Sequence, residues 1–195
     1  NAASARVLVR GVNIHPGSAK GKMKNAILIG MEFHRLLPPF EDPANTEGYE
    51  GFHHLMHFAG SEERAELVYI IRDHDRAKFE AKKAFFLRAA EFLNARFGES
   101  TLEIRMSDSY YNMREKIEPH MEIIARADEA MRACSVTPII VPIRGGTDGA
   151  RLSYMGLPCP NLSTGGYNFH SRHEYIPVQA MEKMTDVLVE IVRAR

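Results

Sequence analysis

The stretch from Gly51 to Arg72 reads GFHHLMHFAGSEERAELVYIIR, and it sets the pattern for the first half of the chain. Two runs rich in β-branched and aromatic residues, Gly51 to Ala59 and Ala65 to Arg72, flank the polar turn Gly60-Ser61-Glu62-Glu63. Two strand-like runs joined by a short glycine-bearing turn are typical of a β-hairpin. We therefore expect an antiparallel pair of strands here.

The segments on both sides of this hairpin extend the pattern. Upstream, Arg6 to Ile14 is apolar and β-branched, and from Asn25 onward apolar residues recur at helical spacing until Pro38-Pro39. Downstream, Asp75 is a candidate N-cap for a helix that ends at Gly98, and Leu102 to Met106 alternates apolar and polar side chains. The order is βαββαβ, the ferredoxin-like pattern, so we predict a compact α+β domain from about Ala2 to Ser107 with an exposed outer strand.

The remaining residues read as part of a second domain. Met113 to Cys134 and Val178 to Arg193 have helical periodicity, and Pro138 to Ile143 is a short apolar run typical of a strand. Two helices and a short strand are too few to form an α/β layer by themselves. We thus predict domains at residues 1–107 and 108–195, the second being a portion of a larger α/β domain.

Composition narrows the class of protein. The chain has 195 residues, with 25 basic and 25 acidic side chains, which gives no basic patch for nucleic acid or an anionic membrane. No apolar run reaches the length of about 18 residues that a membrane span needs. The only two cysteines, Cys134 and Cys159, have no framework spacing, which favours a reducing cytoplasm. The beginning, NAASARVLVRGVNI, lacks a Met and predicts a chain cut from something longer.

Two glycine pairs, Gly145-Gly146 and Gly165-Gly166, frame the segment most suited to a site. Glycine pairs mark backbone with positive φ or close approach to another group. Thr147 follows the first pair, and His170 follows the second with Glu174 four residues later. A histidine on a rigid turn is a typical metal ligand, although an isolated loop histidine more often only caps a turn.

Five segments in order resemble the di-zinc metallopeptidase family that includes tripeptide aminopeptidases, aminoacylases and succinyl-diaminopimelate desuccinylase. They are HPGSAKGKMKNA from His15, TEGYEGF from Thr46, YIIRDHDR from Tyr69, DSYYNMREKI from Asp108, and GGTDGARLSYMGLPCPNLSTGGYNFHSRHEYI from Gly145. The resemblance covers essentially the whole chain and is closest to the tripeptide aminopeptidases. It implies a lid and dimerisation domain followed by the carboxyl-terminal portion of a catalytic domain, so that the chain is half of an enzyme about twice as long.

The resemblance also implies roles for particular residues. His170 matches a metal position, the other ligands of the two zinc ions and the general base being in the absent amino-terminal half. His15 matches a lid histidine that reaches into the neighbouring subunit of a homodimer to stabilise the oxyanion. The positions that match substrate-binding residues are Asn25, Arg72, Arg144, Gly146 and Thr147. The fragment is then expected to be a zinc aminopeptidase by family, acting on tripeptides, but inactive alone.

Several alternatives remain open from the sequence. Glu62-Glu63 is the only adjacent Glu pair, and we interpret it as a solvated turn. His53 and His57 would share one face of a regular strand while His54 points away, which favours a surface strand over a metal triad. Asn25 is also a natural helix cap, and Arg72 could pair with Asp73 or Asp75. The chain as a whole could instead be a non-catalytic lid protein that dimerises or binds peptides, or an amidohydrolase of N-acyl amino acids.

Overall fold

A computed structural model describes residues 1–193 and divides the chain into two compact units. The first unit is Asn1–Asn112, and the second begins at Met113.

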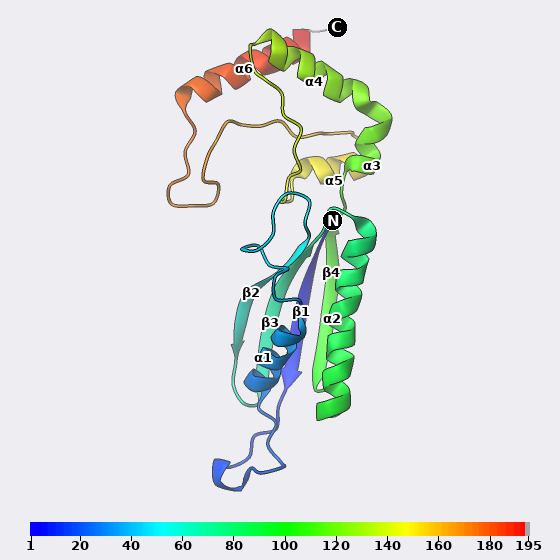
Figure 1. Ribbon diagram of the computed structural model, residues 1–195, viewed down its shortest axis with the longest axis vertical. Coiled ribbons are helices and arrows are strands. Elements are labelled where there is room, and N and C mark those ends of the chain that lie inside the picture. Colours follow the sequence, from blue (N-terminus) through cyan, green and yellow to red (C-terminus); the bar gives the residue numbers. More distant parts are fainter. Residues whose placement is uncertain (194–195) are drawn as a thin grey trace. The chain divides into compact units, whose positions relative to one another are not determined.

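The first unit is a four-stranded antiparallel sheet with two helices (Figure 1). The strands are β1 (Ala2–Arg10), β2 (Phe52–Gly60), β3 (Arg64–Arg72) and β4 (Leu102–Tyr110), in the spatial order β2-β3-β1-β4. The helices are α1 (Ala26–Leu36) and α2 (Arg76–Phe97), with a short 3₁₀ turn, η1 (Pro16–Ser18), before α1. This is the ferredoxin-like arrangement that the order of elements predicts, and the α+β fold class is confirmed.

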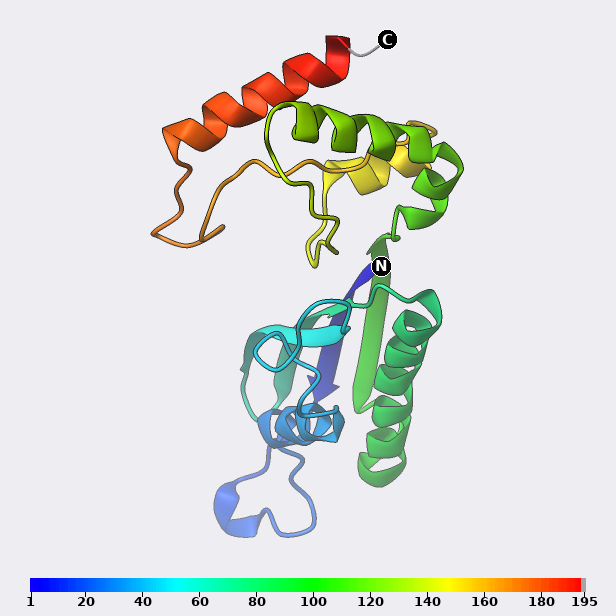
Figure 2. The ribbon, with the colours of Figure 1, turned by 45° about the horizontal axis from the view of Figure 1, so that its top comes forward.

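Strict alternation of side chains builds the core of this unit. In β1 and β3 every second residue points toward the helices, and the residues on that face are almost fully buried: Ala3, Ala5, Val7, Val9, Ala65, Leu67, Tyr69 and Ile71. Phe33 of α1 and Phe79 and Phe86 of α2 close over them. Figures 1 and 2 show both helices against the same face of the sheet, which leaves the other face without a helix.

The edge strand β2 does not follow the regular alternation that the sequence analysis assumed. A β-bulge lies between Leu55 and His57, so that the pairing with β3 shifts by one residue. The bulge reverses the face of the residues after it. His53 is buried at 5% exposure while His57 is exposed, so the expectation that the two histidines share one face was wrong.

Local signals set the ends of the helices. The Asn25 side chain accepts hydrogen bonds from the backbone N–H groups of Ile27 and Leu28, and Asp75 accepts one from Lys78. Gly98, with φ of 104°, ends α2. β1 begins and ends four residues before the predicted strand Arg6–Ile14, because the chain leaves the sheet at Gly11. A β-carbon on Gly11 would lie 1.9 Å from the carbonyl oxygen of Glu62, so the hairpin turn packs directly on this point.

The second unit is helical and irregular. It contains α3 (Arg114–Ile117), the 3₁₀ turn η2 (Glu118–His120), α4 (Met121–Ala133), α5 (Asp148–Tyr154) and α6 (Val178–Arg193). The predicted helix from Met113 to Cys134 is interrupted by η2, where Pro119 stands within the turn. The helix α5 was not predicted.

The predicted strand from Pro138 to Ile143 is absent from this unit. These residues have no regular structure, and their apolar side chains are exposed, with Ile139 at 77% and Ile140 at 78%. A strand forms only against a partner that accepts its backbone hydrogen bonds. The described residues supply no such partner, so the apolar run remains uncovered.

Candidate functional site

His15 stands at the tip of a loop that connects β1 and α1. The base of the loop is closed by a bridge between Val12 and Lys24 and by a hydrogen bond from Gly11 N to the carbonyl oxygen of Glu63. The imidazole is exposed, and its Nδ1 accepts a hydrogen bond of 3.2 Å from the Gly17 backbone N–H. A neutral imidazole whose Nδ1 accepts carries its proton on Nε2. His15 thus presents an Nε2–H donor to the solvent.

His15 and Asn25 line one cavity of about 550 Å³, which Glu62 also lines. The Oδ1 atom of Asn25 is used as the cap of α1, at 3.0 Å from Ile27 N and 3.2 Å from Leu28 N. Glu62 was interpreted as a solvated turn residue, and the structure places it half-buried on this cavity. The contact was missed because it depends on the hairpin turn packing onto a loop nearly forty residues earlier in the chain.

Arg72 lies at the last position of β3, on the face of the sheet without helices. Its guanidinium carbon is 6.0 Å from the centre of the Phe52 ring, directly across the strand pair, and its other neighbour in the sheet is Ala2. An arginine held against an aromatic ring keeps its planar donors oriented for a carboxylate.

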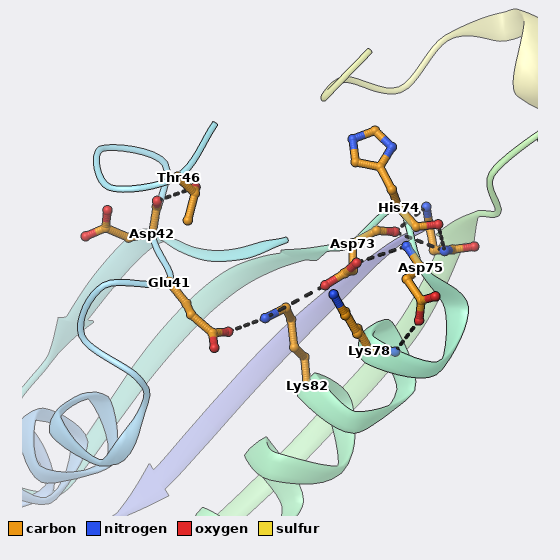
Figure 3. Close-up of polar contacts among 9 residues, drawn as sticks. Glu41, Asp42, Thr46, Asp73, His74, Asp75, Lys78 and Lys82 are labelled. Atoms are coloured by element: carbon orange, nitrogen blue, oxygen red, sulfur yellow. Dashed lines mark hydrogen bonds and ion pairs between the residues drawn. The ribbon is translucent and has the colours of Figure 1, made fainter. Parts of the chain in front are cut away.

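A cluster of charged residues fixes the end of β3 next to Arg72 (Figure 3). Asp73 is buried at 3% exposure, and its Oδ1 accepts a hydrogen bond of 2.9 Å from Asp75 N. Its Oδ2 lies 3.9 Å from Lys82 Nζ, which also pairs with Glu41. These contacts join α2, the strand end and the loop before β2. Of the two acids considered as partners of Arg72, Asp73 makes these contacts and Asp75 caps α2.

The turn before α5 contains the second group of predicted residues, Arg144, Gly146 and Thr147. Thr147 is the residue before α5, and its hydroxyl accepts a hydrogen bond of 3.1 Å from Asn161 Nδ2. Of the four paired glycines only Gly165 has a positive φ, of 75°. Positive φ, one of the two reasons expected for a glycine pair, therefore does not apply at Gly145 and Gly146.

His170 lies on an exposed loop with a strained backbone. Its φ is +66°, which is uncommon for a residue with a side chain, and its backbone N–H donates to Glu174 Oε2 at 2.9 Å. The loop is closed by a bridge between Tyr167 and Tyr175, whose rings stack with centres 5.2 Å apart. Glu174 therefore fixes the backbone of His170. The imidazole projects from a turn that this hydrogen bond and the Tyr167–Tyr175 contact stabilise.

A metal ion does not fit the residues of this chain alone. Within residues 1–193, no three His, Cys, Asp or Glu side chains are placed so that they could hold one. A protein site for zinc needs at least three such ligands. A metal bound at His170 would require ligands from elsewhere. Both cysteines are free thiols, and none of the described helices is long and apolar enough to cross a membrane.

Residues 1–101 match the peptidase dimerisation domain family. The chain belongs to this family. The match covers β1, β2, β3 and both helices, together with His15, Asn25 and Arg72, and it ends one residue before β4.

Individual relatives are similar to nearly the whole length of the chain, beyond the residues of the dimerisation domain. Peptidase T from Caldanaerobacter subterraneus is 56% identical over 98% of the chain, and peptidase T from Halothermothrix orenii is 57% identical over 98%. The chain spans 47% of each of these relatives. A solved structure of a tripeptidase from Staphylococcus aureus has the same fold, with a TM-score of 0.82 and 17% identity over 98% of this chain and 51% of the other.

Proposed function

We propose that this chain is the lid and one part of the catalytic domain of a zinc aminopeptidase that releases the amino-terminal residue from tripeptides. The observation that carries the proposal is the identity of 56% to peptidase T over 98% of the chain, which includes the His15, Arg72 and His170 segments. The relatives named above favour neither a non-catalytic lid protein nor an amidohydrolase of N-acyl amino acids.

In this proposal the chain supplies binding and positioning groups. Arg72 binds the carboxylate of the peptide, because its planar donors and the neighbouring Phe52 ring suit a bidentate contact. Arg144, Gly146 and Thr147 of the second unit contribute substrate-binding groups, and Asn25 of the first unit contributes another. Asn25 has its Oδ1 engaged in the helix cap, so its Nδ2 is the atom that can donate to a peptide.

His15 stabilises the oxyanion of the neighbouring subunit. The Gly17 N–H bond to Nδ1 supports this role, since it leaves Nε2–H as the donor. A hydrogen-bond donor aimed at the developing negative charge lowers the barrier for attack on the scissile carbonyl. His170 supplies one ligand for zinc, and the half of the enzyme that this chain does not span would supply the other ligands and the general base.

The first unit supplies the contact with a second copy. Within the sheet of the described residues β2 pairs with β3 alone, so most of its other edge is without a strand partner, although His53 N–H bonds to Glu41 O. Next to it, α1 exposes Leu28 at 61% and Met31 at 42%. We propose a homodimer formed through this edge and helix. The two unpaired thiols further support a cytoplasmic location.

The experiment is an activity measurement with and without a complementing half. The chain with zinc and trialanine should release no alanine, whereas the chain coexpressed with the remaining half of Caldanaerobacter peptidase T should release it. An Arg126→Gln chain is a control, since this exposed residue of α4 is outside all the predicted positions. Efficient turnover by the chain alone would overturn the proposal, and so would an inactive complemented protein that is correctly folded.

A further inference from the structure

A second cavity lies beside the edge strand, and the proposed peptidase function makes no use of it. It has a volume of about 560 Å³ and is formed by the end of α1, the loop that follows it and the start of β2. Its lining includes His34, Arg35, Leu37, Pro39, Asp42 and His53. This volume is within the range of pockets that bind small organic molecules.

The side chain of His53 is mostly buried and reaches the cavity without a hydrogen bond from residues 1–193. His53 is 5% exposed, and its ring nitrogens, which make no hydrogen bond within the part of the chain that is described, are not completely buried. Its backbone N–H is fixed by the carbonyl oxygen of Glu41 at 2.8 Å, and its ring packs edge-on against Phe86. The cavity is where His53 can find a partner.

His34 adds a second donor to the cavity. Its Nδ1 is 3.1 Å from the hydroxyl of Tyr69, which is fully buried. Burial raises the pKa of Tyr69, so the hydroxyl keeps its proton and donates it to Nδ1. The neutral His34 ring then carries its own proton on Nε2.

The charged residues that line the cavity also favour a ligand that accepts hydrogen bonds. Arg35 is exposed, and among residues 1–193 it has no ion-pair partner. The one acid of the lining, Asp42, is already engaged, since its Oδ1 accepts hydrogen bonds from Ala44 N, Asn45 N and Asn45 Nδ2. The donors therefore outnumber the available acceptors.

We infer that this cavity binds a small carboxylate with an apolar body, of about the size of a branched-chain amino acid. The carboxylate would accept hydrogen bonds from Arg35 and His53, which are charge-assisted at the guanidinium group. The apolar body would lie against Leu37 and the prolines of the loop. A metal ion is a poor occupant, because the described residues place no three metal-ligating side chains together.

Binding should tighten as the pH falls from 8 to 6. The pKa of His53 is lowered mainly by burial, so the ring is neutral at pH 7. Glu41 and Asp42 favour its protonated form, whereas His34 and Lys82 oppose it. A bound carboxylate adds a negative charge, which raises the pKa of His53, so that binding takes up a proton. His54, a second histidine on the lining, is changed to Gln in a control.

The test uses 4-methylpentanoate and its uncharged isostere 4-methylpentanamide, titrated into the 195-residue chain by calorimetry and by amide NMR. We expect the carboxylate to bind and to shift amides of residues 35–44 and 53–55, and the amide to bind at least tenfold more weakly. Arg35→Gln should weaken carboxylate binding about tenfold. Arg126→Gln, which removes the same charge from the second unit, should leave it unchanged.

His53→Gln keeps a hydrogen-bonding side chain and removes the titrating ring, so it should abolish the tightening at low pH, whereas His54→Gln should retain it. The inference is overturned if neither ligand binds, if the two bind equally, or if the shifted amides lie outside the cavity. It also fails if Arg35→Gln and Arg126→Gln behave alike. None of these outcomes depends on peptidase activity, so the proposed function can stand or fall separately.

Discussion

Gly51→Ala should strongly destabilise the first unit, because no space exists for a side chain there. A β-carbon at this position would lie 2.0 Å from Asp73 Oδ2 and 2.7 Å from Lys82 Cε. The buried carboxylate must move, which disturbs its hydrogen bond from Asp75 N and its contact with Lys82. Overpacking costs about 1–3 kcal/mol, and losing a hydrogen bond to a charged group costs about 1.5–3 kcal/mol. We therefore expect a loss of about 3–5 kcal/mol in the free energy of unfolding.

The assay is urea unfolding followed by hydrogen exchange of amides in β1 and β3, which reports on the first unit alone. Gly48→Ala is the matched control: its φ is +53° and a β-carbon there meets nothing within 4 Å, so only about 1–2 kcal/mol of backbone strain is expected. In an Asp73→Ala background, Gly51→Ala should cost at least about 1 kcal/mol less than in the wild type. Equal costs at Gly51 and Gly48, or strict additivity with Asp73→Ala, would refute the reasoning.

Three further predictions concern single residues. Burial lowers the pKa of His53, so at pH values below the ordinary 6.5 the unfolded chain binds more protons than the folded chain, and stability should fall as the pH drops through 6.5. His53→Gln should flatten this dependence of stability on pH in urea unfolding at pH 5 to 8. An unchanged slope would contradict the assignment. Tyr69→Phe removes the hydroxyl that bonds to His34 and should cost about 1 kcal/mol by the same assay, whereas no change would mean that the bond contributes nothing. Ile140→Asp should change the stability of the chain by less than about 0.5 kcal/mol, because the residue is 78% exposed. The same substitution should prevent complementation by the other half of peptidase T. Normal complementation would show that the apolar run Pro138 to Ile143 remains exposed in the complete enzyme.

Local patterns were sufficient to predict the first unit. The alternation in Ala65 to Arg72, the Asn25 and Asp75 caps and Gly98 each depend on residues within one turn or strand, and the structure has each of them. The ferredoxin-like order then follows from the order of the elements and the rule that neighbouring elements pair.

Contacts between distant segments were not predictable in the same way. The bulge at Leu55 to His57 reversed the faces of the β2 histidines, and no local residue signals it, since neither glycine nor proline is present there. The contact of Glu41 with Lys82 joins residues 41 positions apart. The run Pro138 to Ile143 has strand-like composition, but composition cannot supply a partner strand.

In the candidate site, too, some features follow from the sequence and others depend on distant segments. His15 follows from resemblance to a family, and His170 from its place after a glycine pair together with that resemblance; the structure puts both on exposed loops held by their own neighbours. The residues of a second subunit, or of the other half of the enzyme, that approach these two loops depend on the assembly. They can therefore be tested only with that assembly.

The most direct measurement mixes two inactive variants of the complemented enzyme, His15→Ala and His170→Ala. If His15 acts on the neighbouring subunit, a mixed dimer contains one site with both an intact His170 and an intact partner His15. Random pairing would then restore about a quarter of the wild-type tripeptide turnover. If the mixture stays as inactive as each variant alone, although mass spectrometry shows that mixed dimers form, His15 does not serve the neighbouring site and the account is contradicted.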